Sequence, residues 1–575
     1  DLTLMHTNLE RKSKELKDYV SKYESTKFLG ELSSLMHWIG TESTTLQGLD
    51  SPQKQLFYLA ALNITSTIPA GQTSEELFSD KEWNEIKLLL EEISASHMLL
   101  FDLKEGQIAT DEWIEKRNVA LPAFFSYYNQ GLLNYDEQII DRVDTYFRPF
   151  TPEIEAEFGL SVEDFINIYN WVDSLTNKYW LEKLNPRKDE KSREEFINEM
   201  KEKNLMPWEW HEHMPQSEKN FMEFMSDKGR VSRFTFSEMK EEFGESKSNA
   251  FLKIFTCTRK ETDYLFFTEE NPLFFSPIFQ IDEQTYQAFE LKYLILAVYN
   301  VLTKFSTTDK KLASRFTKYR GNQLEIKTKN LFKDFFSKDA KIHNSFFTNL
   351  EGEQDLLILE KGTAFIIEVK ATKQDAPRRD PERAYPILVQ DFKAAIQKGY
   401  DQCYRIMQKF ILKMNFPIFT DEGRRKKNLD IRTKNYHSAF SIIVTLERFG
   451  HLQMDLSGML EIYDDDEFPW SVCIDDLEMI LLVMKKEGLN STDFIKFLRI
   501  RQQLHGRLIA HDESEVAGAY IRYGFSRQLI EGEDVINIPP GAGNIFDDYY
   551  NYKGMGLKNE KNLELKTSGK YMVLG

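Results

Sequence analysis

Three residues in the middle of the chain, Asp355, Glu368 and Lys370, have types and spacing that suit chemistry with a bound cation. Between Asp355 and Glu368, two apolar runs flank the pair Lys361-Gly362. Such runs around a Gly-containing two-residue loop predict a β-hairpin, because Gly readily adopts the positive φ that the tight turn requires. In that hairpin Asp355 lies directly opposite Glu368, and the strand period of two returns Lys370 to the same face.

Two carboxylates on directly opposed strand positions repel each other unless a cation lies between them. Mg²⁺ prefers oxygen ligands and completes its coordination with water and phosphate, and Mn²⁺ suits the same ligands. The ammonium of Lys370 would then orient or deprotonate a water, or offset negative charge on a phosphate. The alternative is a structural hairpin with salt-bridged ends.

Asp355, twelve intervening residues and then Glu368-Val369-Lys370 resemble the signature of the PD-(D/E)XK nuclease superfamily. Gln354 stands where that family has a proline. The resemblance covers about residues 319–450 and implies an αβββαβ restriction-endonuclease-like core. It also implies a Mg²⁺ cofactor held by Asp355 and Glu368, with Lys370 as a catalytic residue.

The sequence around the hairpin predicts the other elements of such a core. Apolar residues at helical spacing predict helices over 321–336 and 389–412. Apolar runs predict a first strand over 345–350 and a last strand over 439–446.

Two further residues join the site by the same resemblance. Glu325 on the first helix would be a catalytic residue and a third metal ligand, and Gln397 on the second helix a catalytic residue. A solvated carboxylate beside Lys329 is the other interpretation of Glu325. Gln402 and Tyr404 compete with Gln397 for its role.

The chain has a net charge of −18, yet basic residues gather around the predicted hairpin. Residues 301–350 contain 11 Lys and Arg but 4 Asp and Glu. Positive charge beside an acidic metal site would hold phosphates, whereas a solvated surface explains any single cluster equally simply. We expect contacts with nucleic acid, DNA being favoured, from Arg320, Lys327, Lys373, Arg378, Arg379, Arg424 and Arg425.

Length and composition set the broader class. A chain of 575 residues exceeds what one hydrophobic core needs and favours three or four domains. The three cysteines lack disulfide or metal spacing, and no apolar run is long enough to cross a bilayer. These features favour a cytoplasmic protein with no membrane partner.

We expect an α/β multidomain chain with four regions. These are a mostly helical N-terminal region (1–215), a small α+β connecting module (216–302), the nuclease-like core (303–460) and a helical C-terminal appendage with a tail (461–575). In the first region, Ser161 and Asp164 predict a capped helix. In the second, two helices and strand-like runs, one at 264–268, suggest a winged-helix arrangement with a packing role. In the last, the acidic run 464–467 predicts a solvated turn.

The expected activity is that of a metal-dependent endonuclease that hydrolyses phosphodiester bonds, most readily those of DNA. Resemblance further suggests an anti-phage defence effector that forms a homodimer or larger assembly and binds a partner protein through its N-terminal region. The alternatives are a catalytically silent nuclease-like binding or scaffold subunit, and an effector that cleaves RNA. The absence of an aromatic-rich RNA-binding signature ranks RNA below DNA.

Overall fold

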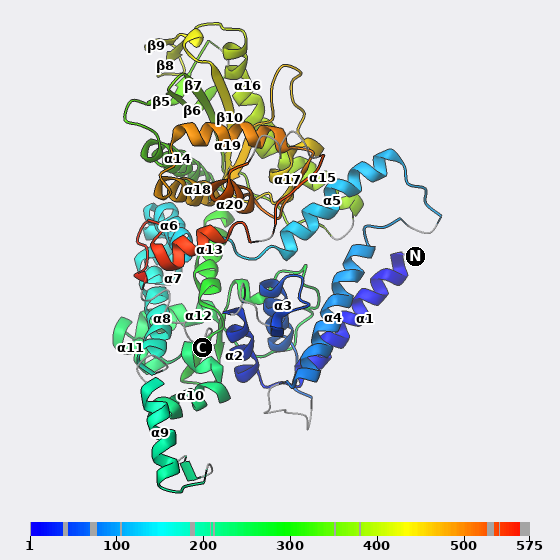
Figure 1. The fold of residues 1–575 in the computed structure, drawn as a ribbon, viewed down its shortest axis with the longest axis vertical. Helices are drawn as coiled ribbons and strands as arrows, with labels where there is room; N and C mark the ends of the chain where they lie inside the picture. Colours follow the sequence, from blue (N-terminus) through cyan, green and yellow to red (C-terminus); the bar gives the residue numbers. More distant parts are fainter. Residues whose placement is uncertain are drawn as a thin grey trace. The chain divides into compact units, whose positions relative to one another are not determined.

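The computed structural model describes residues 2–563 except 38, 40–43, 70–77, 104–105, 184–189, 207–208, 211–212, 215, 350–351, 379–380, 526–533 and 540. The chain forms two compact units (Figure 1). Unit 1 comprises residues 1–100, 128–309 and 558–575, and unit 2 comprises residues 101–127 and 310–557. Unit 2 is therefore inserted into unit 1 along the chain, and the four predicted regions do not coincide with the two units.

Unit 1 is mostly helical. Its helices are α1 (Leu2–Ser21), α2 (Ser25–Met36), α3 (Pro52–Ile64), α4 (Asp80–Leu99), α6 (Asp136–Phe147), α7 (Thr151–Phe158), α8 (Val162–Lys183), α9 (Glu190–Glu202), α10 (Gln216–Ser226), α11 (Phe236–Phe243), α12 (Glu245–Phe255) and α13 (Leu291–Thr308). The predicted cap of α8 is confirmed: the Asp164 N–H donates to the Ser161 hydroxyl at 3.1 Å, and the Ser161 N–H donates to the Asp164 carboxylate at 2.9 Å. The C-terminal segment returns to this unit, where the Lys561 ammonium lies 3.0 Å from Asp173 and 3.4 Å from Asp136.

A four-stranded sheet completes unit 1. Its strands are β1 (Arg233–Thr235), β2 (Thr256–Cys257), β3 (Ile278–Gln280) and β4 (Thr285–Ala288), in the order β1-β4-β3-β2. Helices α11 and α12 lie between β1 and β2 in the chain, so the predicted order of two helices followed by strands is present. The strand expected at 264–268 is wrong, because this segment contains turn and irregular backbone instead.

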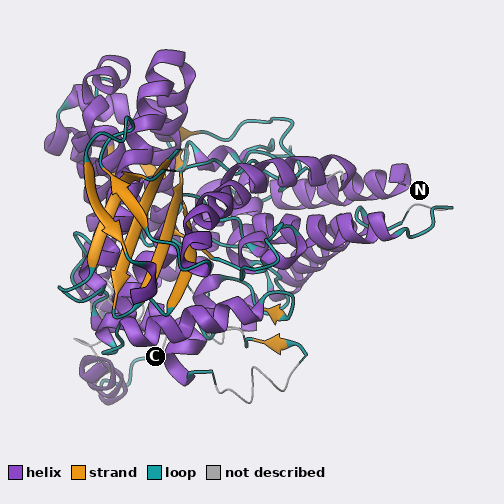
Figure 2. Cartoon of the chain, turned by 90° about the horizontal axis from the view of Figure 1, so that it is seen from above, coloured by secondary structure: helices purple, strands orange, loops and turns teal. Residues whose placement is uncertain are grey.

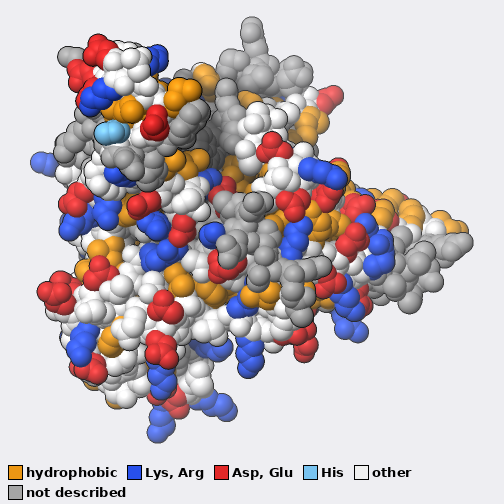
Figure 3. Space-filling model, turned by 90° about the horizontal axis from the view of Figure 1, so that it is seen from below, with side chains coloured by type: hydrophobic (Ala, Val, Ile, Leu, Met, Phe, Trp, Pro, Cys, Tyr) orange, Lys and Arg blue, Asp and Glu red, His pale blue; other side chains and the backbone are white. Residues whose placement is uncertain are grey.

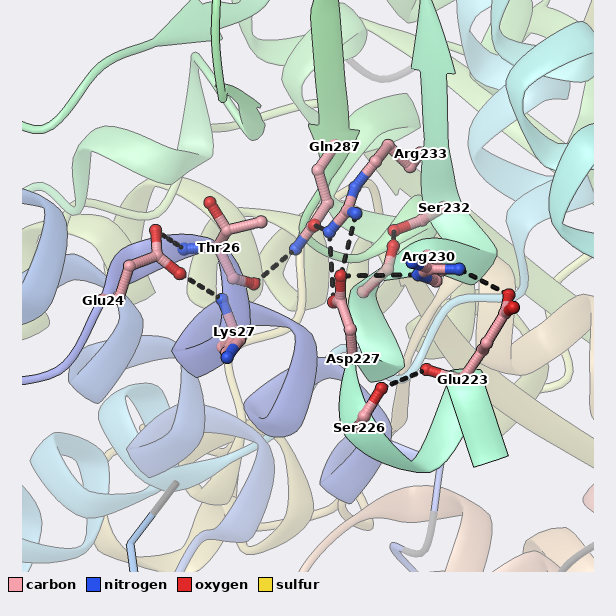
Figure 4. A network of polar contacts seen from close by, with 11 residues as sticks. Glu24, Thr26, Lys27, Glu223, Ser226, Asp227, Arg230, Ser232, Arg233 and Gln287 are labelled. Atoms are coloured by element: carbon pink, nitrogen blue, oxygen red, sulfur yellow. Dashed lines mark hydrogen bonds and ion pairs between the residues drawn. The ribbon is translucent and has the colours of Figure 1, made fainter. Parts of the chain in front are cut away.

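A polar network ties α2 to the segment that leads into β1 (Figure 4). The Arg233 guanidinium donates to Asp227 at 2.8 and 3.1 Å and to the Gln287 side chain at 2.9 Å. Gln287 in turn donates to the Thr26 carbonyl at 3.0 Å. Close backbone approach accompanies these bonds, since a Cβ added to Gly30 would lie 2.4 Å from the Gly229 nitrogen.

Unit 2 is organised around a seven-stranded mixed sheet (Figure 2). Its strands are β5 (Lys341–Phe347), β6 (Glu353–Glu360), β7 (Thr363–Lys370), β8 (Phe416–Phe419), β9 (Lys427–Ile431), β10 (Ser438–Thr445) and β11 (Trp470–Cys473), in the order β11-β10-β7-β6-β5-β8-β9. Its helices include α5 (Asp111–Asn129), α14 (Lys310–Phe335), α15 (Pro381–Phe392), α16 (Lys398–Ile411), α17 (His451–Met454), α18 (Ile474–Lys486), α19 (Ser491–Leu504), α20 (Glu513–Tyr523) and α22 (Asn544–Asp548). A short parallel pair, β12 (Leu508–Ile509) and β13 (Ile536–Asn537), lies in the same unit.

Strands β5, β6 and β7 form an antiparallel meander, and β10 returns parallel to β7. With α14 before the meander and α15–α16 after it, the predicted order of helix, three strands, helix and strand is present. The last predicted strand is one residue from its observed position, whereas β8, β9 and β11 extend the sheet beyond the prediction. Because β11 pairs with β10, the predicted appendage from residue 461 onward shares the sheet of the core.

Apolar side chains cover both faces of this sheet. On one face, Leu357 and Ile366 pack with Cys403, Ile406 and Phe410 of α16. On the other, rings from the end of α14, the strands and α19 pack together: Phe336 lies 4.8 Å from Phe365, and Phe365 lies 6.0 Å from Phe494. The β6–β7 hairpin is thus buried on both faces, as its uninterrupted apolar runs predict.

Candidate active site

The register of the β6–β7 hairpin confirms the predicted turn, in which Lys361 and Gly362 form the loop. Glu360 pairs with Thr363 and Leu356 pairs with Ile367, so the next positions along the ladder are Asp355 and Glu368. The turn residues Lys361 and Gly362 have φ values of 45° and 73°. Both are left-handed, as a two-residue hairpin loop of this twist requires. The turn therefore fixes which residues meet at the open end of the hairpin.

Asp355, Glu368 and Lys370 meet at that open end. The Asp355 N–H donates to the Glu368 carboxylate at 3.3 Å, and the Val369 N–H donates to the Asp355 carboxylate at 2.8 Å. The Lys370 ammonium lies 2.9 Å from Glu368 and 3.7 Å from Asp355. The side chains of Asp355 and Lys370 are only 15% and 12% exposed, and that of Glu368 is 1% exposed. This is a sheltered acidic pair with one ammonium beside it.

Burial and crowding shift the protonation of this group. Burial, reinforced by the charge of Asp355, raises the pKa of Glu368 to about 8 against the opposing effect of Lys370. Burial alone would lower the pKa of Lys370, but the Glu368 and Asp355 carboxylates raise it above its usual value. Lys370 is therefore protonated and positively charged at neutral pH. Glu368 retains its proton up to about pH 8, and a metal ion that bound to its carboxylate would displace this proton.

Glu325 belongs to the same electrostatic group although it comes from α14. Burial and the charges of Asp355 and Glu353 raise the pKa of Glu325 to about 7, with Lys370 acting in the opposite direction. The same charges would not act on a carboxylate solvated far from the hairpin. These charge effects favour a position for Glu325 near the predicted site over the interpretation as a solvated carboxylate beside Lys329.

Glu353 is an acidic neighbour that the sequence interpretation did not include. Burial and the charge of Asp355 raise the pKa of Glu353 as well. It lies two residues before Asp355 on β6, and the strand period of two puts both on one face. That alternation was the signal in the sequence that could have identified Glu353.

The chemistry of these donors fits a hard divalent cation. Asp355 and Glu368 offer closely spaced carboxylates, and Mg²⁺ commonly uses one or two carboxylates with water and phosphate. Glu325 is a further oxygen donor in the same electrostatic group. Within the described residues, no group of three or more His, Cys, Asp or Glu side chains is arranged to hold a metal ion.

Gln397 has other partners. Its amide accepts from the Glu461 N–H at 2.9 Å and donates to the Glu461 carbonyl at 3.0 Å. It also donates to Asp401 at 3.0 Å. The structure therefore assigns the Gln397 amide to the attachment of a neighbouring segment and does not bring it into contact with Asp355 or Glu368.

The segment held by Gln397 includes the acidic run 464–467. Tyr463 stacks on Tyr404 with ring centroids 3.7 Å apart, and the Tyr404 hydroxyl donates to Asp465 at 2.7 Å. Most of the run is exposed, as a solvated turn predicts, but Asp466 is half-buried and burial raises its pKa to about 6. Tyr404, the competing candidate, therefore binds the same segment as Gln397 does, the one that contains Glu461 and the acidic run.

Two of the basic side chains predicted to contact nucleic acid, Lys327 and Arg424, bind other residues of the protein. The Lys327 ammonium lies 3.0 Å from Glu478 of α18, with side chains only 17% and 10% exposed. The Arg424 Nε donates to the Thr348 carbonyl at 2.6 Å. Both side chains thus link parts of unit 2, which argues against their prediction as phosphate contacts.

The other basic candidates differ in position. Lys373, Arg378 and Arg425 are exposed, and Lys373 lies 3.5 Å from Asp375. Arg379 lies outside the described residues. Arg320 is half-buried and donates to the Ala371 carbonyl at 3.3 Å. On the face shown in Figure 3, Lys and Arg side chains are interspersed with Asp and Glu.

The comparisons with known proteins found no family model, curated protein or solved structure that matches the chain. Among the described helices, none combines the length and apolarity needed to cross a membrane.

Proposed function

We propose that the protein is a metal-dependent nuclease that hydrolyses phosphodiester bonds, with DNA as the favoured substrate and Mg²⁺ as the cofactor. The observation that carries this proposal is the convergence of Asp355, Glu368 and Lys370 at the open end of one buried hairpin. A buried carboxyl whose pKa is raised, as that of Glu368 is, and a second carboxylate beside it together suit a bound cation. The resemblance to PD-(D/E)XK nucleases and the restriction-endonuclease-like order of elements support the same conclusion.

Each residue has a role in this proposal. Asp355 and Glu368 bind the cation, and Glu325 supplies a further acidic group. The cation, when bound, activates water and neutralises charge on the phosphate and the leaving oxygen. The Val369 N–H holds the Asp355 carboxylate in place through its 2.8 Å bond.

Lys370 acts as an ammonium. Because the flanking carboxylates raise its pKa, it donates hydrogen bonds and offers positive charge to an attacking water or a phosphate oxygen. Burial of the site strengthens this electrostatic interaction, since the surrounding apolar strands exclude water. This role favours orientation and charge stabilisation by Lys370 over proton abstraction while Glu368 and Asp355 remain beside it.

The test is a substrate panel with the full chain. Linear, circular and single-stranded DNA and RNA are incubated with the protein in Mg²⁺, in Mn²⁺ or in EDTA. Cutting that requires the metal and disappears in Lys370→Ala supports the proposal. Metal-independent binding without cutting identifies a silent nuclease-like subunit instead, and cutting confined to RNA identifies an RNA-cleaving effector.

The biological setting is a further part of the proposal and rests on resemblance alone. We propose an anti-phage defence effector in which unit 1 binds a partner protein or receives a signal. Cleavage of both strands of a duplex would require a homodimer or larger assembly, because one such site cuts one strand. The oligomeric state in solution, measured with and without DNA, tests this part separately.

A further inference from the structure

Helix α14 brings a second cation to the end of β7. The Arg320 Nη2 donates to the carbonyl of Ala371, the residue directly after Lys370, at 3.3 Å. The guanidinium carbon lies 5.2 Å from the centre of the Phe316 ring, one turn earlier on the same helix. Stacking of this kind restricts a guanidinium to one plane. Arg320 is therefore held beside the strand end that carries the candidate active site.

The guanidinium has no anionic partner in the described part of the chain. Among the residues that the structure describes, its buried Nε has no hydrogen-bond acceptor, and its Nη2 donates to the neutral Ala371 carbonyl. An arginine carries five N–H donors, and a half-buried positive charge without a counter-ion is unfavourable. We therefore infer that an anion from outside the protein can serve as the counter-ion of Arg320.

A structural arginine in the same chain shows the contrast. Arg259 of unit 1 donates to the carbonyls of Ser21, Tyr23 and Ser66 and to the hydroxyls of Ser25 and Ser66. All three nitrogens of the Arg259 guanidinium therefore donate hydrogen bonds within the protein. By contrast, Arg320 has one bond of this kind among the described residues, from its Nη2 to the Ala371 carbonyl.

A second unpaired polar atom lies near the same strand ends. Gln354 is 2% exposed, yet its Oε1 has no hydrogen-bond partner in the described residues. It precedes Asp355 on β6 and by alternation occupies the face opposite to Asp355. Unpaired buried polar atoms are rare in folded proteins and commonly mark the position of an ordered water or a ligand.

We propose that Arg320 binds a phosphate of the nucleic-acid strand that enters the candidate active site. The planar guanidinium suits bidentate contact with phosphate oxygens, and its position beside Ala371 sets that phosphate next to Lys370. The inference rests on the proposed nuclease function and assigns to Arg320, among the basic candidates, the contact nearest the chemistry. Arg320 holds substrate and takes no part in activating water.

The experiment measures binding and cleavage in the full chain with Arg320→Gln and Arg320→Lys. Lys333→Gln is the matched control, because Lys333 lies in the last turn of the same helix, is exposed and carries the same charge. Affinity for a labelled oligonucleotide is measured in EDTA over a series of salt concentrations. Loss of one phosphate contact should reduce the slope of log K against log[salt] by about 0.7 for a single strand and about 0.9 for a duplex.

We expect Arg320→Gln to weaken binding about tenfold or more, as loss of a charge-assisted bond does, and to reduce the salt slope. Arg320→Lys should restore the slope but only part of the affinity, since an ammonium is not bidentate. Lys333→Gln should leave both unchanged. In Mg²⁺, Arg320→Gln should raise KM more than it lowers kcat, because substrate holding is lost rather than water activation.

Two results would overturn the inference, and they differ from failure of the proposed function. A lower melting temperature of Arg320→Gln with an unchanged salt slope would make Arg320 a structural residue. An unchanged affinity and slope, while Lys370→Ala abolishes cutting, would leave the nuclease standing and remove the phosphate contact. If the unsubstituted protein neither binds nor cuts any nucleic acid, the function and the inference fall together.

Discussion

The ammonium of Lys370 lies 2.9 Å from the carboxylate of Glu368, whose side chain is 1% exposed. The two residues are separated by one position on β7, so strand alternation alone sets them on one face. The second carboxylate, that of Asp355, lies 3.7 Å from the same ammonium, while the Asp355 N–H donates to Glu368 at 3.3 Å. A divalent cation that binds Asp355 and Glu368 would therefore free the ammonium for an external group.

Lys370→Ala should lower the rate of metal-dependent cleavage by about 10²- to 10³-fold, the range typical of one donor that stabilises charge in the transition state. Lys370→Arg should recover little, because a planar guanidinium does not reproduce the compact ammonium between two carboxylates. Single-turnover cleavage of a labelled oligonucleotide measures both. Lys338→Ala is the control, since Lys338 is exposed just after α14, where the neighbouring Ser337 N–H donates to Glu360 at the turn end of the hairpin. Equal rates for Lys370→Ala and Lys338→Ala would contradict the assignment.

Stability without metal should fall as the pH rises through about 8. Burial and Asp355 raise the pKa of Glu368 from the 4.5 of an unperturbed carboxyl to about 8, so the folded chain retains a proton that the unfolded chain has lost. The corresponding stability is present below pH 4.5 and disappears as the pH passes through about 8. Melting temperatures in EDTA from pH 5 to pH 9 measure this loss.

Glu368→Gln isolates that effect from other titrations, because an amide cannot lose the proton. The difference in melting temperature between the unsubstituted chain and Glu368→Gln should shift in favour of Glu368→Gln toward pH 9. Mg²⁺ should stabilise the unsubstituted chain more at pH 8.5 than at pH 6.5, since the ion competes with the proton for Glu368. A difference that does not vary with pH would argue against a protonated Glu368.

Gly399→Ala should destabilise unit 2 by about 1–3 kcal/mol, the usual cost of overpacking. A Cβ at this position of α16 would lie 3.0 Å from Ile443 Cγ2 and 3.6 Å from the Lys370 Cε. Gly321→Ala in α14 is the control, because a Cβ there meets nothing within 4 Å. That substitution should stabilise the protein by about 0.5–1 kcal/mol through helix propensity. Urea unfolding of both variants provides the comparison, and equal shifts would show that α16 does not pack tightly against Ile443 of β10.

Gly362→Ala should cost about 1–2 kcal/mol, because Gly362 has a φ of 73° and its Cβ would lie 3.2 Å from the His437 ring. Lys361→Asn should preserve or slightly raise stability, since Asn tolerates the left-handed conformation that Lys361 adopts at a φ of 45°. Thermal unfolding measures both, and the Mg²⁺-induced rise in melting temperature reports whether the site register survives. Tolerance of Gly362→Ala would indicate that another feature sets the register.

The sequence was most informative where the information is local. The turn at 361–362, the period of two and the apolar runs together specify the hairpin register, and β10 follows from one clear apolar run. Glu353 could have been found by the same alternation. These features depend on nearest neighbours along the chain.

Contacts between residues far apart in the chain could not be predicted from local patterns of this kind. Strand β9 is mostly exposed and polar, so its membership of the sheet depends on pairing with β8 rather than on its own pattern. The four-residue β11 directly precedes the largely buried helix α18, and its short run gives no sign of a strand apart from that helix, so the sequence predicts only a helical appendage there. The attachment of Gln397 to Glu461 joins residues 64 positions apart, and nothing local distinguishes such an amide from one that faces a substrate.

Residues 558–575 form the third stretch of the chain that belongs to unit 1, after residues 1–100 and 128–309. Lys561 lies between Asp136 of α6 and Asp173 of α8 and so attaches this segment to both helices. Loss of Lys561 would leave these two partly buried carboxylates without the ammonium that they share. Among the described residues, the attachment of this segment thus depends on charges within unit 1 and on no residue of the candidate active site.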